Sequence, residues 1–443
     1  MKPVACRPGP SGPGWSGGSE RTRPTYVLAA LLIAASASAQ TLTLKQAEEA
    51  ALQHHPQIQQ QQASAKAAAE VVREAKSPYY PTVYGSVTGA ESQNASRIAA
   101  GALNNPVIYD RFATGVTVSQ LVTDFGRTHA LSDSASLLAQ AQDQNVTTQR
   151  ADVLVRVDRA YFNLLRAQAV LRVATDTVRT RQVVADQVSA LAASNLKSSL
   201  DVSFAKVNLA EAQLLLVQAQ NDVKSADAEL SAAMGSADDR EYALAEEQLP
   251  APPLPDVAPL VAVALRDRPE VAAARFSSDA VARFADAEGD LSLPSISAVG
   301  AFGAIPYRQD TLNDHYAAAG INLNVPIFNG NLYPARHAEA MFRAKAERQH
   351  LLDIQNRISR DVRVAWLDAR SAFERLALTD QLLEQATLAL DLAQTRYTLG
   401  LSSIVELTQA QLNKTQAEIA QASARFEYQT RTAVLKYQTG ALR

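Results

Sequence analysis

The segment ADVLVRVDRAYFNLLRAQAVLRVATD, Ala151 to Asp176, lies within a longer stretch, 127–193, that contains neither proline nor glycine. Those two residues are the ones that most often interrupt a helix. A helix over the whole stretch would be about 100 Å long, whereas helices of ordinary domains average about three turns. A second such stretch, 331–399, has its one proline, Pro334, in the predicted first turn. The sequence therefore predicts two helices that are too long for a globular domain.

Apolar residues recur along the first stretch at spacings of three and four residues, and several of them are small: Val153, Val157, Ala160, Leu164, Ala167 and Leu171. This period places them on one face of a helix. Small side chains let neighbouring helices approach closely, and the polar residues between them suit solvated faces. We therefore predict that the long helices pack in a coiled-coil bundle.

The chain repeats its own pattern. LQHHPQI (52–58) aligns with LRDRPEV (265–271) at an offset of 213 residues, and AYFN (160–163) aligns with AWLD (365–368) at an offset of 205. The proline-rich stretch PAPPLP, 250–255, reads as an extended connector between the two halves. A repeated supersecondary unit gives such constant offsets, so we predict two repeats, 40–249 and 250–443.

Both repeats have the same predicted layout. A shorter helix leads to two strands, and then come a long helix, a turn and a second long helix. In the first repeat these elements cover 43–76, 81–90, 113–122, 127–193 and 199–234. In the second repeat they cover 256–288, 294–303, 316–327, 331–399 and 403–439.

Apolar and polar residues alternate in the predicted strands, as in GVTVSQ (115–120) and INLNV (321–325). Such dyads are typical of membrane β-barrel strands, but a half-buried antiparallel sheet alternates equally well. The strand count separates the two interpretations. Four strands cannot close a barrel, because the smallest membrane barrels have about eight, and an open edge in lipid leaves backbone groups unpaired. Strands that span a membrane would therefore have to be shared among chains, and three chains would supply twelve.

Residues 1–39 are predicted to be a signal peptide. Arg21 and Arg23 precede a short apolar run, and Ala37-Ser38-Ala39 provides a small-x-small cleavage pattern before Gln40. A membrane anchor is the alternative interpretation, but the apolar run is short for a span. Cys6, the only cysteine, lies in this segment, so no disulfide is expected in the mature chain.

At this point the sequence resembles the outer-membrane efflux protein family of TolC-like channels. The resemblance covers about residues 41–440, in order and twice over. The matching positions are Leu44, Ala47, Ala50 and Pro56; Pro78-x-x-Pro81; Leu121-x-x-Asp124-Phe125-Gly126-Arg127; Val325-Pro326-Ile327-Phe328-Asn329-Gly330; and Arg396-Tyr397-x-x-Gly400-x-x-Ser403-x-x-Glu406-Leu407-x-x-Ala410-Gln411.

The resemblance implies a mainly helical fold with a membrane β-barrel portion. Three copies of the chain would form a twelve-stranded barrel in the outer membrane and a helical tunnel in the periplasm. The channel would be a passive conduit for drugs, small molecules or secreted protein. It would act with a periplasmic adaptor and an inner-membrane pump or secretion ATPase. The alternative is a soluble periplasmic coiled-coil adaptor or scaffold protein, which accounts for the helices but leaves the strands unexplained.

Two groups of site residues follow from the resemblance. The adaptor-contact tips correspond to Asn195, Leu196, Lys197 and Ser198 and to Gly400, Leu401 and Ser402. Asp201 and Glu406 occupy matching positions just past the two turns and correspond to acidic residues of the channel constriction. Gln409 replaces the family's second acidic residue and Ser402 a latch arginine. The alternative role for Asp201 and Glu406 is electrostatic, because an acid in the first turn of a helix favours the positive end of the helix dipole.

The sequence predicts neither an enzyme nor a bound metal or cofactor. His54 and His55 stand together, but no carboxylate or cysteine completes a ligand spacing. There is no P-loop, no dinucleotide-binding glycine turn after a strand, and no nucleophile elbow. The formal net charge of -3 gives no support for nucleic-acid binding.

Overall fold

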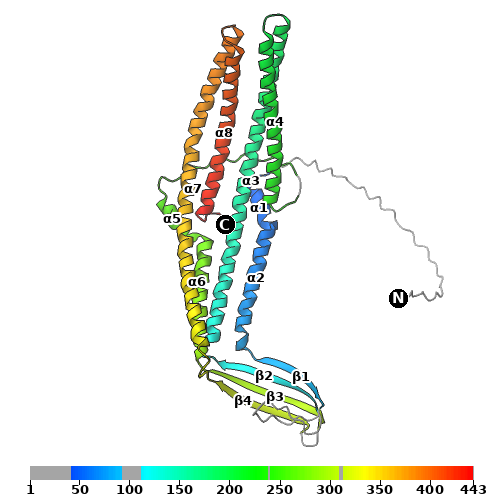
Figure 1. Cartoon of the computed structure of the whole chain (residues 1–443), viewed down its shortest axis with the longest axis vertical. Coiled ribbons are helices and arrows are strands. Elements are labelled where there is room, and N and C mark those ends of the chain that lie inside the picture. The colour runs from blue at the N-terminus through cyan, green and yellow to red at the C-terminus, as the bar shows by residue number, and fades with distance from the viewer. Residues whose placement is uncertain (1–40, 92–110, 238–239, 309–312, 443) are drawn as a thin grey trace, which may run out of the picture. The chain divides into compact units, whose positions relative to one another are not determined.

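The computed structural model describes residues 41–91, 111–237, 240–308 and 313–442. The residues in these ranges belong to one compact unit that contains four long helices and one sheet (Figure 1). The helices α3 (Arg127–Ala193) and α7 (Leu332–Thr398) have 67 residues each. The helices α4 (Ser199–Ala233) and α8 (Ile404–Gln438) have 35 residues each and pack against α3 and α7 as two hairpins. The predicted fold class, mainly helical with four antiparallel strands, is confirmed.

The shorter helices correct the prediction. Each of the two ranges expected to be one helix, 43–76 and 256–288, contains two: α1 (Leu44–His54) with α2 (Pro56–Lys76), and α5 (Ala258–Asp267) with α6 (Pro269–Gly289). The breaks fall at His55 and Arg268, whose ψ angles of 123° and 127° are extended. Each precedes a proline, and the proline ring disfavours the helical conformation of the residue before it.

The sheet has the order β1-β2-β3-β4, and all neighbours are antiparallel. Its strands are β1 (Thr82–Ala90), β2 (Arg111–Thr123), β3 (Ser295–Arg308) and β4 (His315–Asn324). Two strand ends differ from the prediction by more than two residues. The fourth strand stops at Asn324 instead of 327, because Pro326 has no N–H to donate to a ladder. The third continues past 303 to Arg308, pairing with Arg111, and Pro306 falls within a shift of register.

Directly paired residues point to the same face of a sheet, so the register shows which side chains share a face. Val83 pairs with Val118, Val116 with Phe302, Ala298 with Ile321, and Ile296 with Leu323. The other face carries Thr82, Ser86, Thr117, Ser119, Ser297 and Asn322. One face is therefore mainly apolar, with Thr114 and Gln120 as exceptions, and the other carries most of the polar residues of the sheet.

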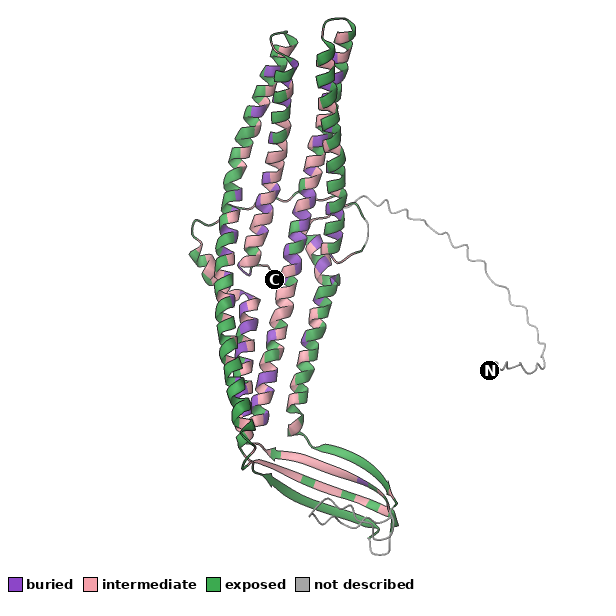
Figure 2. Cartoon of the chain, in the orientation of Figure 1, coloured by how far each residue is buried: buried purple, intermediate pink, exposed green. Residues whose placement is uncertain are grey.

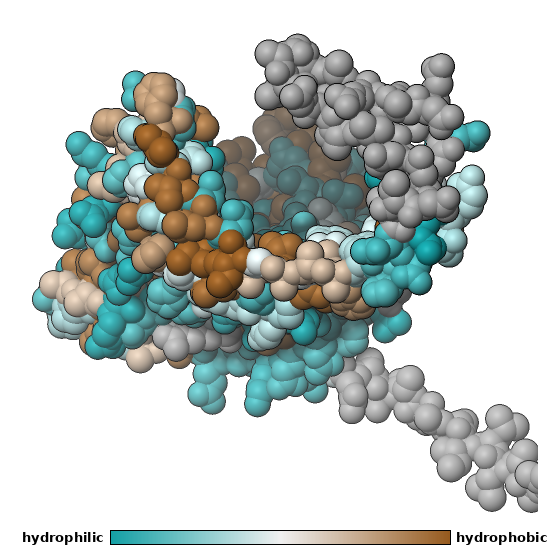
Figure 3. All heavy atoms as spheres, turned by 90° about the horizontal axis from the view of Figure 1, so that it is seen from below, coloured by the Kyte–Doolittle hydropathy of each residue, from teal (hydrophilic) through white to brown (hydrophobic). Residues whose placement is uncertain are grey.

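In the single chain, the apolar face of the sheet is exposed to solvent and no other described element covers it. Val83 is 61% exposed, Phe302 55% and Ile321 79%. In Figure 2 nearly all of the sheet is intermediate or exposed, whereas buried residues are frequent along the helices. Seen from the sheet end, hydrophobic side chains gather in a band across the nearest surface (Figure 3). A patch of this kind marks a membrane or protein contact.

A linker over residues 240–257 crosses one side of the hairpins and is held by three aromatic side chains. The Tyr161 hydroxyl donates to the backbone oxygen of Ala245 at 2.6 Å, and the Tyr428 hydroxyl to that of Ala251 at 2.6 Å. Trp366 Nε1 donates to the backbone oxygen of Leu254 at 2.8 Å. Each of these bonds satisfies a buried polar group, so the linker is fixed on this side of α3, α7 and α8.

Asp158 of α3 is a buried acid, only 3% exposed. Burial raises the pKa of its carboxyl to about 8, and the neighbouring Glu48 of α1 acts in the same direction. Because the folded chain holds this proton more tightly than the unfolded chain, stability falls as the pH rises from the ordinary pKa of 3.8 to about 8. Asp158 is thus expected to destabilise the folded protein less at acidic pH than at pH 8.

Asp158→Asn should therefore unfold at a higher temperature than the parent protein at pH 8, and the difference should shrink at pH 5. Asparagine keeps the shape of the side chain and cannot ionise. Thermal unfolding at the two pH values measures this. Asp176→Asn, an exposed acid on the same helix, is the control and should show no such pH-dependent gain. Lower stability of Asp158→Asn at pH 8 would contradict the prediction.

Candidate functional site: the tips of the two helical hairpins

The turn between α3 and α4 is closed by a residue in the left-handed region. Asn195 has φ 58°, and the Leu196 N–H donates to the Leu191 backbone oxygen at 2.9 Å, which closes a turn of six residues, 191–196. This bond satisfies one of the free carbonyls at the end of α3. Asparagine adopts the left-handed conformation more readily than other side chains do, which explains how it fills a position suited to glycine.

The turn between α7 and α8 repeats this geometry with a glycine. Gly400 has φ 74°, and the Leu401 N–H donates to the Arg396 oxygen at 2.8 Å. Residues predicted to form the two tips from their sequence positions thus adopt the same backbone conformation. The two hairpins end in equivalent turns, as expected for a repeated unit.

Asp201 lies in the first turn of α4, where its carboxylate caps the helix. Its Oδ2 accepts from the Ser198 backbone N–H at 3.1 Å and from the Ser198 hydroxyl at 3.0 Å. In return, the Asp201 N–H donates to Ser198 Oγ at 3.1 Å. This reciprocal pair is a capping box. The carboxylate thus has a structural partner in the chain, in agreement with the alternative role considered for it.

Glu406 lies in the first turn of α8 and forms an ion pair with Arg396, in the last turn of α7, at 3.1 Å. The two side chains are 44% and 55% exposed, so the pair contributes little stability on its own. Sequence reasoning identified both residues but not their contact. The contact depends on how the turn at Gly400 brings the two helix ends together, and the sequence spacing does not reveal this.

The two tips contact each other within one chain. Lys197 Nζ lies 4.2 Å from the centre of the Tyr397 ring, a cation–π contact between the first tip and α7. Below it, Asn208 Nδ2 donates to Thr408 Oγ1 at 3.2 Å, from α4 to α8. A small apolar core lies beside these contacts and contains Ala185, Val188, Ala205, Ile404 and Leu407. The tips therefore form one surface, which the sequence did not predict.

Large apolar side chains stand exposed on this surface. Leu196 is 69% exposed, and Leu399 and Leu401 are 68% exposed each. Ser402, by contrast, has a buried Oγ with no hydrogen-bond partner among the described residues. Exposed leucines around a polar turn are typical of a protein contact surface, and three of the predicted adaptor-contact residues, Leu196, Lys197 and Leu401, lie on it.

The described residues contain no group of three or more His, Cys, Asp or Glu side chains arranged to hold a metal ion. His55 instead caps α2, its Nδ1 accepting from the Gln57 N–H at 3.2 Å. Within the same part of the chain, every helix is too short or too polar to cross a bilayer.

A four-stranded sheet with one apolar face, joined to two long helical hairpins, is the architecture expected of an outer-membrane efflux channel. The model of the family described as outer membrane efflux protein matches residues 33–236 and 260–441. The chain belongs to this family, and the resemblance drawn from its motifs is confirmed. It is an outer-membrane protein with a helical periplasmic extension, and the alternative of a soluble adaptor or scaffold is not supported.

Two relatives illustrate the similarity. The chain is 25% identical over 381 residues to Protein CyaE of Bordetella pertussis, covering 84% of this chain and 78% of CyaE. It is 22% identical over 420 residues to the outer membrane protein TolC of Escherichia coli strain K12, covering 92% of this chain and 84% of TolC.

Solved structures share the fold. The outer-membrane channel OprN superimposes with a TM-score of 0.79 at 20% identity, covering 90% of this chain and 89% of OprN. VceC from Vibrio cholerae also gives 0.79 at 20% identity, covering 90% of this chain and 96% of VceC.

Proposed function

We propose that three copies of this chain form one channel, in which their sheets close a twelve-stranded barrel and their hairpins form a periplasmic tunnel. The observation that carries the proposal is the open sheet. Within the described residues, β1 pairs only with β2 and β4 only with β3, while one face is mainly apolar. An apolar sheet with two free edges is unstable in lipid unless other chains pair with those edges.

Exposed apolar stripes on the helices support the same assembly. On α4 the stripe is Leu200, Phe204, Val207, Leu214 and Val217, each at least 40% exposed. On α7 it is Leu378, Leu382, Leu388 and Leu392, each at least 51% exposed. At about 100° per residue, the members of each stripe fall within about 140° around their helix, so each stripe lies on one helix face. Packing α4 of one copy on α7 of the next covers both stripes, and three such contacts close a ring.

The channel acts as a passive conduit and carries out no catalysis. The hairpin tips bind a periplasmic adaptor, through which an inner-membrane pump or secretion ATPase delivers drugs, small molecules or secreted protein. The exposed leucines of the tips support this proposal, because an apolar patch on a long helical projection needs a partner. One relative is described as a cobalt-zinc-cadmium resistance protein, CzcC of Cupriavidus metallidurans, and is 29% identical over 239 residues.

Disulfide cross-linking tests the assembly. The chain has no cysteine beyond Cys6, so Leu214→Cys with Leu382→Cys places one thiol on each stripe, about 16 residues from the tips. The expected result is dimers and trimers on non-reducing gels after oxidation. Leu214→Cys with Asp380→Cys is the control, because Asp380 lies about 160° around α7 from Leu382 and accepts from Gln421 of α8 in its own hairpin. Monomers only from the first pair, or equal cross-linking from both, would argue against this contact.

Asp201 and Glu406 would place six carboxylates around the periplasmic mouth of such a trimer. Clustered acids between low-dielectric walls favour cations over anions. Glu406→Gln should therefore lower the cation preference in single-channel recordings, and Asp201→Asn with Glu406→Gln should lower it further. Asp201→Asn keeps a side-chain oxygen that can accept from the Ser198 N–H, so the cap at the start of α4 is preserved.

The control is the assembly itself, which should resist heat in detergent as well as the parent protein does. Multivalent cations should also block from the periplasmic side and lose potency in the double variant. Unchanged selectivity and unchanged block would leave these acids with only the contacts that the structure shows, the capping box and the pair with Arg396.

A further inference from the structure

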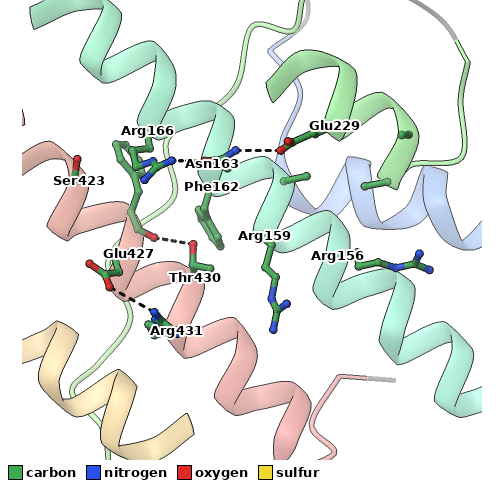
Figure 4. A pocket seen from close by; sticks show the side chains of 14 residues that line it. Arg156, Arg159, Phe162, Asn163, Arg166, Glu229, Ser423, Glu427, Thr430 and Arg431 are labelled. Atoms are coloured by element: carbon green, nitrogen blue, oxygen red, sulfur yellow. Dashed lines mark hydrogen bonds and ion pairs between the residues drawn. The ribbon is translucent and has the colours of Figure 1, made fainter. Parts of the chain in front are cut away.

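A groove of about 750 Å³ lies between the middle of α3 and the C-terminal parts of α4 and α8, at the base of the hairpins (Figure 4). It belongs neither to the tips nor to the sheet. Small-molecule sites usually have volumes of about 300–1,000 Å³, so the groove is large enough for one drug-sized molecule.

Two aromatic rings form the apolar part of its lining. Phe162 of α3 is 5% exposed and Phe426 of α8 is 4% exposed. They belong to the buried core between the hairpins, which holds their positions. Only the edges of these rings reach the groove, and the more exposed Ala232 and Ala233 of α4 complete its apolar lining.

The charged side chains around the rings are mostly cationic. Four arginines line the groove, at positions 156, 159, 166 and 431, against two acids, Glu229 and Glu427. At neutral pH the lining therefore carries two more positive than negative charges. Charge of one sign in a partly enclosed space attracts the opposite charge.

Two of these arginines are available to a ligand. Arg431 is paired with Asp368 at 3.0 Å, and Arg156 donates to the Asp152 backbone oxygen at 3.2 Å. Arg166 Nη2, in contrast, donates to the neutral amide of Asn163 at 2.7 Å. Arg159 has no hydrogen bond or ion pair within the described ranges, and its side chain is exposed. An unpaired guanidinium can bind a carboxylate or sulfonate through two parallel hydrogen bonds.

The groove also lies on the free face of the hairpins. The linker 240–257 is held at Tyr161, and Arg159 and Arg166 lie about 160° and 140° around α3 from that residue. The linker therefore leaves this face of α3 uncovered.

We propose that the groove is a binding site for aromatic organic anions that pass through the channel. The ring of the anion packs on Ala232, Ala233 and the accessible ring edges of Phe162 and Phe426. Arg159 binds its carboxylate or sulfonate, and Arg166 adds to the positive field. The inference rests on the proposed channel function and extends it by naming a substrate class.

A matched pair of dyes tests the site on the assembled full-length protein in detergent. 8-Anilinonaphthalene-1-sulfonate and N-phenyl-1-naphthylamine share one ring system, and only the first carries a sulfonate. A hydrogen bond to a charged group contributes about tenfold in affinity. Arg159→Gln should thus weaken binding of the sulfonate about tenfold and change binding of the neutral dye less than twofold. Arg166→Gln should show a smaller loss of the same kind.

Arg179→Gln is the control, because this exposed arginine lies on α3 outside the groove and pairs with Asp176 at 2.8 Å. Binding of both dyes should stay as in the parent protein. Sulfonate binding unchanged in Arg159→Gln, or an equal loss for both dyes, would overturn the proposal.

Access to the groove is measured separately with Arg159→Cys and a charged thiosulfonate reagent. Rapid labelling in the assembled protein is expected. Protection would show that another copy covers the groove and would also overturn the proposal. The cross-linking and conductance tests use no dye, so the channel can be confirmed while this site fails.

Discussion

Ile321→Arg should prevent stable assembly in the membrane. Ile321 is 79% exposed on the apolar face of β4, where it pairs with Ala298 of β3. If that face meets lipid, an arginine there costs about 2–4 kcal/mol near the bilayer midplane. The loss applies to each of three copies in the proposed trimer, so the combined effect exceeds that of most single substitutions.

Asn322→Arg provides the matched comparison, because the neighbouring residue of the same strand points to the polar face. Its assembly should stay close to that of the parent protein, since a lumen-facing charge remains in water. The measurement is the amount of heat-resistant trimer in the outer-membrane fraction at equal expression. Equal loss from both substitutions would show that the two faces have been assigned wrongly, and equal tolerance would place the sheet outside the bilayer.

Gly115→Ala should destabilise the sheet by about 1–3 kcal/mol, the usual cost of an added group in a packed site. Gly115 of β2 pairs with Gly303 of β3, which in turn pairs with Tyr316 of β4. A methyl group on Gly115 would collide with the Tyr316 hydroxyl and lie 3.1 Å from the Phe302 oxygen. The Tyr316 side chain thus lies across Gly115 and Gly303 and covers their backbone, which has no side chain of its own.

The collision partner can be removed, which makes the cause testable. Tyr316→Ala with Gly115→Ala should be less destabilised than the sum of the two single changes, as shown by thermal dissociation of the assembled protein. Gly320→Ala, on the same face of β4, is the control, because nothing lies within 4 Å of its added methyl group. Purely additive effects would mean that Tyr316 does not occupy the space above Gly115.

The features that sequence reasoning identified depend on residues close together in the chain. Long helices follow from stretches without proline or glycine, and the strand faces follow from two-residue alternation. The breaks at Pro56 and Pro269 were also within its reach, because the effect of proline on the preceding residue is local. The prediction of single helices there was wrong because the flanking helical pattern was given more weight than the prolines.

Composition and spacing therefore determined the fold class, the two hairpins and the positions of Asp201 and Glu406 at the helix starts. Only the tertiary structure decided what those residues touch. Glu406 meets Arg396, Lys197 meets Tyr397, and Arg159 has no partner among the described residues. The Lys197–Tyr397 contact joins residues 200 positions apart in the sequence, and such contacts depend on how one hairpin docks against another, as the pairing of the strands depends on register. Both are set by the packing of many side chains together, so no local pattern in the chain records them.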